Sequence, residues 1–160
     1  MVIALGSNLP GQFVSSEALL EAAVARLVEA GLPVLKRSGW WRSAAWPDPS
    51  GPEYRNGVTL VEARGGPHDV LRLLLKIETE FNRIRSGRNA PRTLDLDLIA
   101  HGRQVVEGPD LTLPHPRAHQ RLFVMGPLAE IAPGWRHPVL GRTAAELARE
   151  AAVGADARPA

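Results

Sequence analysis

The sequence predicts an α+β fold, a ferredoxin-like split βαββαβ sandwich with an antiparallel sheet covered by helices on one face. Three observations support this prediction. Apolar runs and helical repeats follow one another in the order strand, helix, strand, strand, helix, strand. No helix is expected between the second and third strands, which argues against the alternative, a doubly wound parallel sheet. The length of 160 residues fits one domain, which we place at residues 1–153, with a frayed tail at residues 154–160.

The first half of this unit consists of a strand, a helix and a strand. Residues 1–5 are apolar and run into a Gly-Ser-Asn sequence, which predicts a buried strand followed by a turn, with Gly6 as a turn residue. Residues 15–30 repeat apolar side chains at helical spacing, with serines able to cap the start and glycine and proline after the end. Residues 34–43 mix apolar and basic side chains and predict one strand that carries two tryptophans.

The second half begins after a loop at residues 46–52, which contain three prolines and a glycine. Residues 58–63 predict the next strand. A Gly-Gly-Pro sequence at residues 65–67 opens a helix that is expected to end near Arg85, because apolar side chains recur along it at helical spacing. Residues 93–100 alternate and predict a strand. A long proline-punctuated stretch then leads to a last short helix around residues 143–151.

The composition excludes several classes of protein. Hydrophobic residues make up 44% and charged residues 22%, which is close to globular averages and argues against a disordered or fibrous chain. No apolar run approaches a membrane span, and the first residues have no basic leader, so we expect a soluble, unsecreted, cytoplasmic protein. Cysteine is absent, which excludes a disulfide framework, a thiolate nucleophile and a cysteine-ligated zinc site.

The cationic residues are unusual in kind. Only Lys36 and Lys76 among the 19 Lys and Arg residues are lysines, although the net charge is only +2. Arginine presents a planar fork that binds phosphate or carboxylate. A net charge this small does not indicate a polyanionic partner, so the distribution of the arginines along the chain carries more information than their number.

The sequence Asp95-Leu96-Asp97 is the first candidate site. In an extended strand the period of two sends Asp95 and Asp97 to one face and the neighbouring leucines to the other. Their Cα atoms would lie roughly 6.5 to 7 Å apart, and two carboxylates this close are unfavourable unless a cation lies between them. Oxygen ligands without histidine or cysteine favour Mg²⁺. Taken alone, such a pair is more often a solvated acidic edge.

The segment before this pair favours the metal site. Arg83, Arg85, Arg88 and Arg92 lie within ten residues that contain no acidic residue and include glycine and proline, as expected for a loop. A basic loop alone is ordinary. Leading directly into two carboxylates, it would bring guanidinium groups to the phosphates that the metal also binds. Phosphoryl transfer depends mainly on such positioning and charge neutralisation.

Two further clusters are candidates for ligand contacts. Prolines flank His115 and would hold it toward a ligand, and Arg121 nearby could donate hydrogen bonds to a phosphate. A proline-ordered surface loop is the alternative. His115 and His119 have no third metal ligand near them, so we reject a zinc site. Tyr54 could stack on a heterocycle whose polar edge Asn56 binds, although these residues alone would be more ordinary as a loop anchor.

Taken together, these segments resemble a known family, the 6-hydroxymethyl-7,8-dihydropterin pyrophosphokinases of folate biosynthesis. The resemblance covers the chain from residue 2 to about residue 150. The most specific motif is the one that contains the acidic pair. The motifs are Ala4-Leu5-Gly6-Ser7-Asn8-Leu9, Tyr54-x-Asn56, Pro91-Arg92-Thr93-Leu94-Asp95-Leu96-Asp97, Pro114-His115 and Arg121-x-Phe123.

The resemblance implies a monomer that transfers the pyrophosphoryl group of ATP to the hydroxymethyl oxygen of the pterin and releases AMP, with no nucleic-acid or membrane partner. It implies two Mg²⁺ ions held by Asp95 and Asp97, with Asp97, Arg83 and Arg92 as catalytic residues. The implied ATP contacts are Glu78, Arg83, Arg85, Arg88, Arg92, Leu98, Thr112, His115 and Arg121. The implied pterin contacts are Ser43, Ala44, Trp46, Tyr54, Asn56 and Phe123.

Two departures and two alternatives qualify this interpretation. Asp110 is one departure, because some members of the family have a basic residue there. Asn89-Ala90 stands where the family commonly has Trp-Gly, so an aromatic cover for the pterin is missing there, and Trp46 is the candidate to replace it. A nucleic-acid-binding module is one alternative, but it would need aromatic residues on the sheet, and residues 58–63 contain none. A Mg²⁺-dependent phosphohydrolase is the other alternative, because it would use the same metal site.

Overall fold

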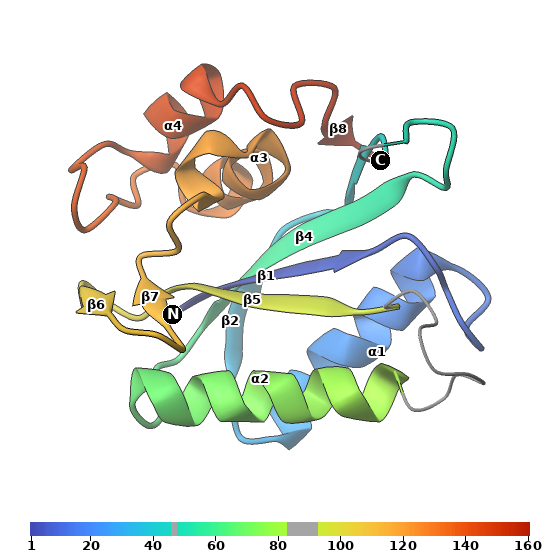
Figure 1. Ribbon diagram of the computed structural model, residues 1–160, viewed down its shortest axis with the longest axis horizontal. Coiled ribbons are helices and arrows are strands. Elements are labelled where there is room, and N and C mark those ends of the chain that lie inside the picture. The colour runs from blue at the N-terminus through green and yellow to red at the C-terminus, as the bar shows by residue number, and fades with distance from the viewer. Residues whose placement is uncertain (46–47, 83–92) are drawn as a thin grey trace.

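The computed structural model describes residues 1–45, 48–82 and 93–160. Its elements follow the predicted order, with additions in the last third of the chain (Figure 1). They are β1 (Val2–Ser7), α1 (Ser16–Glu29), β2 (Val34–Arg37), β3 (Trp41–Ser43), β4 (Tyr54–Val61), α2 (Pro67–Asn82), β5 (Asp95–Ala100), β6 (Val106–Glu107), β7 (Thr112–Leu113), the 3₁₀ helix η1 (Ala118–Gln120), α3 (Leu122–Ile131), α4 (Ala144–Glu150) and β8 (Arg158–Pro159).

The main sheet is antiparallel, as predicted. Its strand order is β5-β1-β4-β3-β8, and β2 also pairs with β4. The strand that follows α2 therefore lies at one edge, next to the first strand, which is the arrangement of a split βαββαβ sandwich. A separate small hairpin joins β6 and β7.

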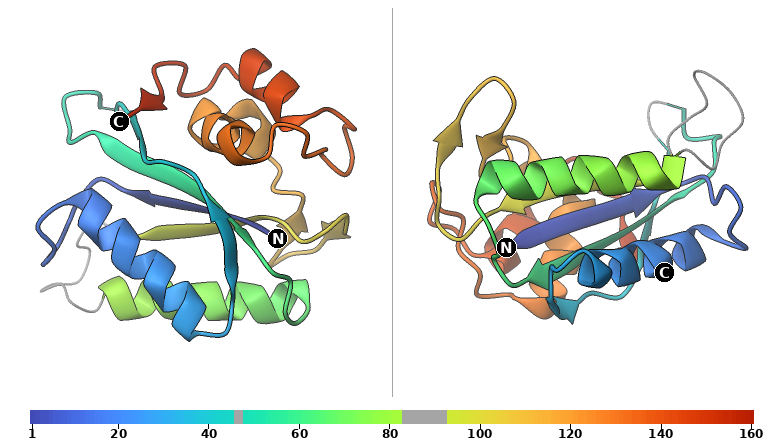
Figure 2. Two further views of the ribbon diagram at one scale, coloured as in Figure 1. Left: turned by 180° about the vertical axis from the view of Figure 1, so that it is seen from behind. Right: turned by 90° about the horizontal axis from the view of Figure 1, so that it is seen from below.

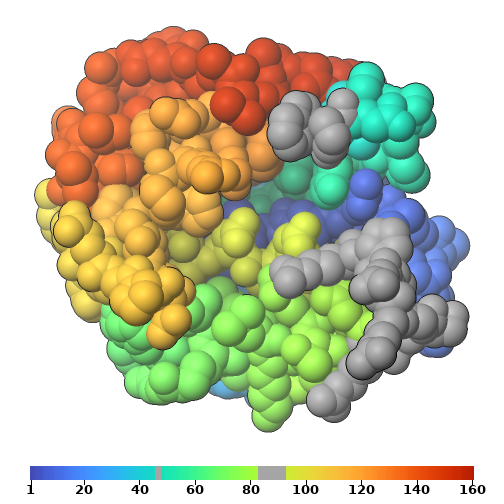
Figure 3. Space-filling view, viewed as in Figure 1, coloured from blue at the N-terminus to red at the C-terminus, as the bar shows by residue number. Residues whose placement is uncertain are grey.

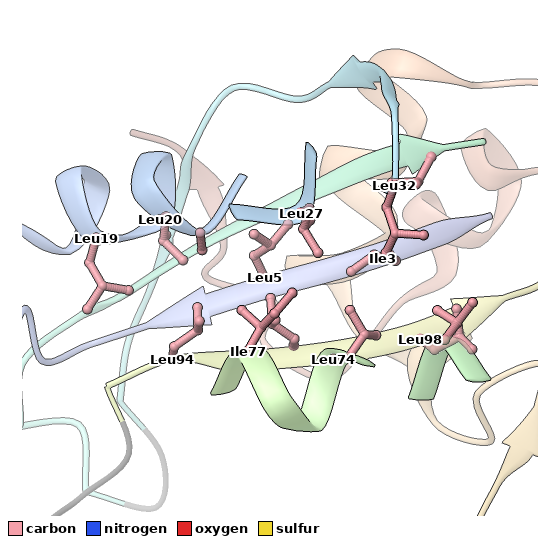
Figure 4. Packing of buried hydrophobic residues seen from close by; sticks show 14 of the residues in the cluster. Ile3, Leu5, Leu19, Leu20, Leu27, Leu32, Leu74, Ile77, Leu94 and Leu98 are labelled. Atoms are coloured by element: carbon pink, nitrogen blue, oxygen red, sulfur yellow. The ribbon is translucent and has the colours of Figure 1, made fainter. Parts of the chain in front are cut away.

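Helices cover both faces of this sheet, whereas the sequence predicted cover on one face. α1 and α2 pack on the first face, where Figure 4 shows side chains of both helices, such as Leu20 and Ile77, gathered around Ile3 and Leu5 of β1. α3 and α4 pack on the second face (Figure 2). The apolar residues of β1 point alternately to the two faces, so this strand contributes to both cores.

α3 is the longest of the elements that the sequence analysis missed. Its sequence contains Gly126 and Pro127, two residues that normally disfavour a helix interior. Tertiary packing compensates for this. The ring of Trp41 lies against Gly126, where a Cβ would be 2.6 Å from the nearest ring atoms. A larger residue would therefore push α3 away from the sheet.

Several strand boundaries also differ from the prediction. β1 continues to Ser7, so Gly6 lies within the strand and is not a turn residue. β4 begins at Tyr54, four residues before the predicted start. The single strand predicted at residues 34–43 is two strands, β2 and β3. Between them the backbone hydrogen-bonds to side chains, since Gly39 N donates to the Glu130 carboxylate at 3.2 Å.

The tail is paired, although the sequence predicted fraying from residue 154. Arg158 and Pro159 form β8 against β3, and Ala157 is buried. Backbone pairing at an exposed sheet edge is independent of side-chain pattern, so composition did not indicate it. Within the described part of the chain, no helix combines the length and the apolar character needed to cross a membrane.

Candidate active site

β5 presents its two aspartates on the second face of the sheet. Leu94, Leu96 and Leu98 are buried in the core with α1 and α2, whereas Asp95 is half-buried and Asp97 is exposed. This confirms the alternation predicted from the period of two. The hydrophobic side of the strand anchors it, and this leaves both carboxylates on the opposite side.

A row of residues crosses the sheet at the level of Asp95. Gly6 of β1 pairs with Asp95 on one side and with Asn56 of β4 on the other, and Asn56 in turn pairs with Trp41 of β3. Directly paired residues in an antiparallel sheet point to the same face. The side chains of Asp95, Asn56 and Trp41 therefore share the second face, although they come from three separate parts of the chain.

Gly6 leaves a gap in this row. A Cβ at Gly6 would lie 3.4 Å from Asn56 Oδ1, so any side chain there would stand between the amide and the carboxylate. Sequence reasoning missed this role because it treated Gly6 as a turn residue. A period of two along the strand supplies the signal, because it places Gly6 on the same face as Val2 and Ala4.

The second face is open over the Asp95 end of this row, whereas α3 covers Trp41 at the other end. α3 and α4 cover one part of the face, and Figure 3 shows the surface hollowed between the C-terminal third of the chain and α2, with parts of β1, β4 and β5 visible inside. The same half of the sheet carries the ends of β1, β4 and β5 that hold Gly6, Asn56 and Asp95. A ligand in this hollow would contact the carboxylates and lie near the largely buried amide of Asn56.

Asn56 is held in place by β3. It is only 6% exposed, and its Nδ2 donates to Ser43 Oγ at 3.0 Å. Ser43 is also buried and pairs with Tyr54, which is half-buried at the start of β4. The next residue, Ala44, is exposed, and its backbone N donates to Asp156 Oδ2 at 2.6 Å. Three of the predicted pterin contacts thus lie at neighbouring positions on two paired strands, and a fourth, Ala44, directly follows β3.

His115 follows a cis peptide bond between Leu113 and Pro114. Its backbone N donates to Ile99 O at 2.8 Å, which fixes it beside β5. Its Nδ1 accepts a hydrogen bond from the backbone N of Arg117 at 3.1 Å. We assign the ring proton to Nε2 because Nδ1 accepts.

The electrostatic surroundings keep His115 neutral. Burial is the largest influence and lowers its pKa; the negative charge of Asp97 opposes this, and the guanidinium groups of Arg121 and Arg117 add to the lowering. A neutral imidazole with Nε2–H can donate a hydrogen bond to a phosphate or to a ribose oxygen without adding charge.

Arg121 and Phe123 come together at the start of α3. The guanidinium carbon of Arg121 lies 5.7 Å from the centre of the Phe123 ring, within the range of a cation–π contact. Both side chains are half-buried. The structure thus brings a predicted ATP contact next to a predicted pterin contact.

Glu78, a predicted ATP contact, is buried and bonds to the backbone of β5. It is 8% exposed in α2, and its Oε1 accepts a hydrogen bond from the backbone N of Leu96 at 2.6 Å. Leu96 lies between the two aspartates, so this bond braces the free edge of β5. Main-chain groups alternate along a strand, so the main-chain N and O of Leu98 point to the same free edge as those of Leu96. The Leu98 side chain is in the core. A contact between Leu98 and ATP would therefore involve the main chain. Thr112 is exposed in β7.

The donor set suits magnesium. Within residues 1–45, 48–82 and 93–160, no group of three or more His, Cys, Asp or Glu side chains is placed to hold a metal. Mg²⁺ is commonly bound by one or two carboxylates together with substrate phosphates and water. Asp95 and Asp97 on one face fit this pattern.

Five of the predicted site residues lie outside the described residues. The predictions for them concern contacts with phosphate and a cover over the pterin, and they stay predictions. They are Arg83, Arg85, Arg88, Arg92 and Trp46.

Two carboxylates and a guanidinium around an open sheet face are suited to binding and transferring phosphoryl groups, and this places the chain among the α+β phosphotransferases. The chain belongs to the 7,8-dihydro-6-hydroxymethylpterin-pyrophosphokinase family, whose model matches residues 2–133. It is accordingly an enzyme of the diphosphotransferase class. This confirms the resemblance found in the sequence.

Individual relatives agree with this assignment. The chain is 43% identical over 147 residues to the 2-amino-4-hydroxy-6-hydroxymethyldihydropteridine pyrophosphokinase of Synechocystis sp., and the match covers 91% of this chain and 73% of that protein. The enzyme of the same description from Pseudomonas aeruginosa is 39% identical over 136 residues, covering 85% of this chain and 82% of that protein.

Solved structures support the fold alone. The crystal structure of Plasmodium falciparum HPPK-DHPS A437G with STZ-DHP superimposes with a TM-score of 0.70 at 14% identity. The match covers 93% of this chain and 44% of that one, so this chain spans less than half of that solved chain.

Proposed function

We propose that this chain transfers the β,γ-pyrophosphoryl group of ATP to the hydroxymethyl oxygen of 6-hydroxymethyl-7,8-dihydropterin, a step of folate biosynthesis. Family membership supports the reaction and its substrates. The observation that carries the proposal for the site is the row across β5, β1 and β4, in which Asp95 and Asn56 face the same open surface on either side of Gly6. A pterin on Asn56 would lie close to phosphates bound at the carboxylates.

In the proposed reaction the hydroxymethyl oxygen forms a bond to the β-phosphorus and the bond from that phosphorus to the α,β-bridging oxygen breaks. AMP leaves with the electron pair, and the hydroxyl proton is released. Asp97, the exposed carboxylate, is the candidate to help accept this proton. Arg121 would bind phosphate oxygens, and His115 would donate from Nε2 without adding positive charge.

Asp95 and Asp97 would hold two Mg²⁺ ions along the triphosphate, as members of this family generally require magnesium. When bound, the ions neutralise charge on the phosphates and orient them. The four arginines between residues 83 and 92 would add neutralising charge; Arg83 and Arg92 are the two proposed to act on the transferred group, and Arg85 and Arg88 would bind the nucleotide. Glu78 would contribute mainly by holding β5, and Leu98 and Thr112 through contacts near the nucleotide.

The pterin would stack between Tyr54 and Phe123 while Asn56 binds its polar edge. The buried position of Asn56 supports this role, because an amide fixed by Ser43 presents its oxygen in one orientation. Ser43 and Ala44 would form the adjoining wall, and Trp46 would cover the ring.

We further propose that the enzyme acts as a cytoplasmic monomer and binds neither nucleic acid nor membranes.

The test is an incubation of the purified chain with ATP, Mg²⁺ and the pterin. Formation of AMP and a pyrophosphorylated pterin in equal amounts is expected. Release of inorganic phosphate at the same rate with and without the pterin would instead identify a phosphohydrolase and contradict the proposal. Omitting Mg²⁺ in the presence of a chelator is expected to abolish product formation.

A further inference from the structure

The last eight residues cross the molecule from the region of α4 to the edge of the sheet (Figure 1). We call residues 153–160 the C-terminal strap. At its first end, Val153 N donates to Gln120 O at 3.0 Å and Leu122 N donates to Val153 O at 2.9 Å. These bonds attach the strap to the start of α3.

The second end of the strap is attached to β3. Arg158 pairs with Arg42, and Ala160 N donates to Trp40 O at 2.9 Å. The strap therefore connects α3, which carries Phe123, to the strand that carries Ser43.

Between these ends the strap contacts both sides of the proposed pterin site. Gly154 has a φ of 67°, and a Cβ there would lie 2.5 Å from Phe123 Cδ1, so the Phe123 ring lies directly against the strap backbone. Two residues later, Asp156 Oδ2 accepts the hydrogen bond from Ala44 N at 2.6 Å. A carboxylate acceptor makes this hydrogen bond stronger than one between neutral groups.

We propose that Asp156 and Gly154 are positioning residues that set the width of the pterin site by holding the Ala44 backbone and the Phe123 ring at a fixed separation. The inference rests on the proposed function. The family model ends at residue 133, before the strap, so the family match does not assign this role. Asp95 and Asp97 lie on β5, at the other edge of the sheet from β8. Asp156 contacts Ala44, whereas the proposed ATP contact Arg121 pairs with Val153 at the other end of the strap. Loss of the Asp156 carboxylate is therefore expected to act on pterin binding and to leave ATP binding unchanged.

The test compares steady-state kinetics of Asp156→Ala, Asp156→Asn and Glu150→Ala with those of the parent chain. Asp156→Ala is expected to raise KM for the pterin about three- to tenfold, as for the loss of one hydrogen bond, with KM for ATP and kcat unchanged. Asp156→Asn keeps an acceptor oxygen but loses the charge, and it is expected to give a KM for the pterin between those of the parent and Asp156→Ala. Glu150→Ala removes a nearby exposed carboxylate that pairs with Arg142, and it is expected to have no effect.

Gly154→Ala provides a second, independent variant. Its Cβ would displace the Phe123 ring, so KM for the pterin is again expected to rise, and to rise by more than KM for ATP, to which Arg121 beside that ring contributes. Pterin binding is also measured by calorimetry with α,β-methylene-ATP, which lacks the bond that breaks in the reaction. This separates binding from turnover.

Two results would overturn the inference. One is a parent-like KM for the pterin in Asp156→Ala, and the other is an equal rise in KM for ATP. Asp156→Asn behaving like Asp156→Ala would overturn the acceptor role. Failure of the proposed function is distinguishable, because the parent chain would then form no pyrophosphorylated pterin at all.

Discussion

Asp97 is the exposed carboxylate of the pair on β5, and its neighbours Leu96 and Leu98 anchor the strand. Replacing it with alanine removes a proposed metal ligand without disturbing the core. We expect Asp97→Ala to lower kcat by about 10³-fold or more, comparable with the loss of a main electrostatic stabiliser, while the thermal midpoint stays near that of the parent. Rapid-quench measurement of AMP formation checks this.

The matched control is Asp69→Ala, which removes an exposed aspartate on α2 that pairs with Arg72. It is expected to leave kcat unchanged. Near-parental turnover in Asp97→Ala would refute the assignment of the site.

Asn56 is the residue whose loss should separate the two substrates. Its amide is buried and fixed by Ser43, so Asn56→Ala removes the group proposed to bind the pterin edge. We expect pterin affinity to fall about 10- to 100-fold and ATP affinity to stay constant in calorimetry. Unchanged pterin affinity would contradict the proposed orientation.

His137 is expected to make stability depend on pH. Burial lowers its pKa, and the neighbouring His119 lowers it further. Its Nδ1 accepts hydrogen bonds from the backbone N of Val139 and of Leu140, at 3.2 and 3.0 Å. The unfolded chain therefore binds a proton more readily than the folded chain, so this contribution is present above the ordinary histidine pKa and is lost as pH falls below it.

Urea denaturation between pH 7.5 and pH 5 measures this effect. The free energy of unfolding of the parent is expected to fall over that range, and His137→Gln is expected to show a smaller fall. An identical pH dependence in the variant would show that other groups are responsible.

At the scale of elements, local patterns predicted the pieces that are locally determined. The Ser15 cap and the apolar repeat were sufficient for α1, and alternation was sufficient for the two faces of β5. The row of Asp95, Gly6 and Asn56 could not be derived in the same way. It depends on the register of β1 with β4 and β5, which are distant along the chain, so no local pattern identifies the residues that lie opposite one another.

α3 also could not be predicted from local sequence. Its sequence disfavours a helix, and the helix forms because it packs on the sheet. We expect Gly126→Ala to reduce the free energy of unfolding by about 1–3 kcal/mol, as overpacking usually does, although alanine has the better helix propensity. The reason is the contact with the Trp41 ring, whose Nε1 also donates to Glu130 of α3 at 2.8 Å.

Gly134→Ala is the matched control for this prediction. A Cβ there would meet no atom within 4 Å, so its stability is expected to equal or exceed that of the parent in urea denaturation. Gly126→Ala as stable as Gly134→Ala would show that α3 adjusts freely to the sheet.

For the whole molecule, one sheet separates two hydrophobic cores, and strand β1 supplies side chains to both. Neither core can therefore lose its packing while the sheet stays intact for the other. The proposed site lies on this shared sheet, with Asp95 on β5 and Phe123 on a helix of the second core. A substitution that disrupts the packing of either core is accordingly expected to lower the stability of the whole molecule, which should still unfold in one transition.

Ile77→Ala and Leu128→Ala test this expectation, because each residue is fully buried in a different core. Each substitution is expected to cost about 2–5 kcal/mol of unfolding free energy. Both variants should unfold in one transition that coincides by circular dichroism and by tryptophan fluorescence, with the m-value of the parent. Two separated transitions in Leu128→Ala would show that α3 and α4 unfold independently of the sheet. In that case Phe123 and Arg121 would be carried by a unit that can detach from the carboxylates of β5 while the rest of the molecule stays folded.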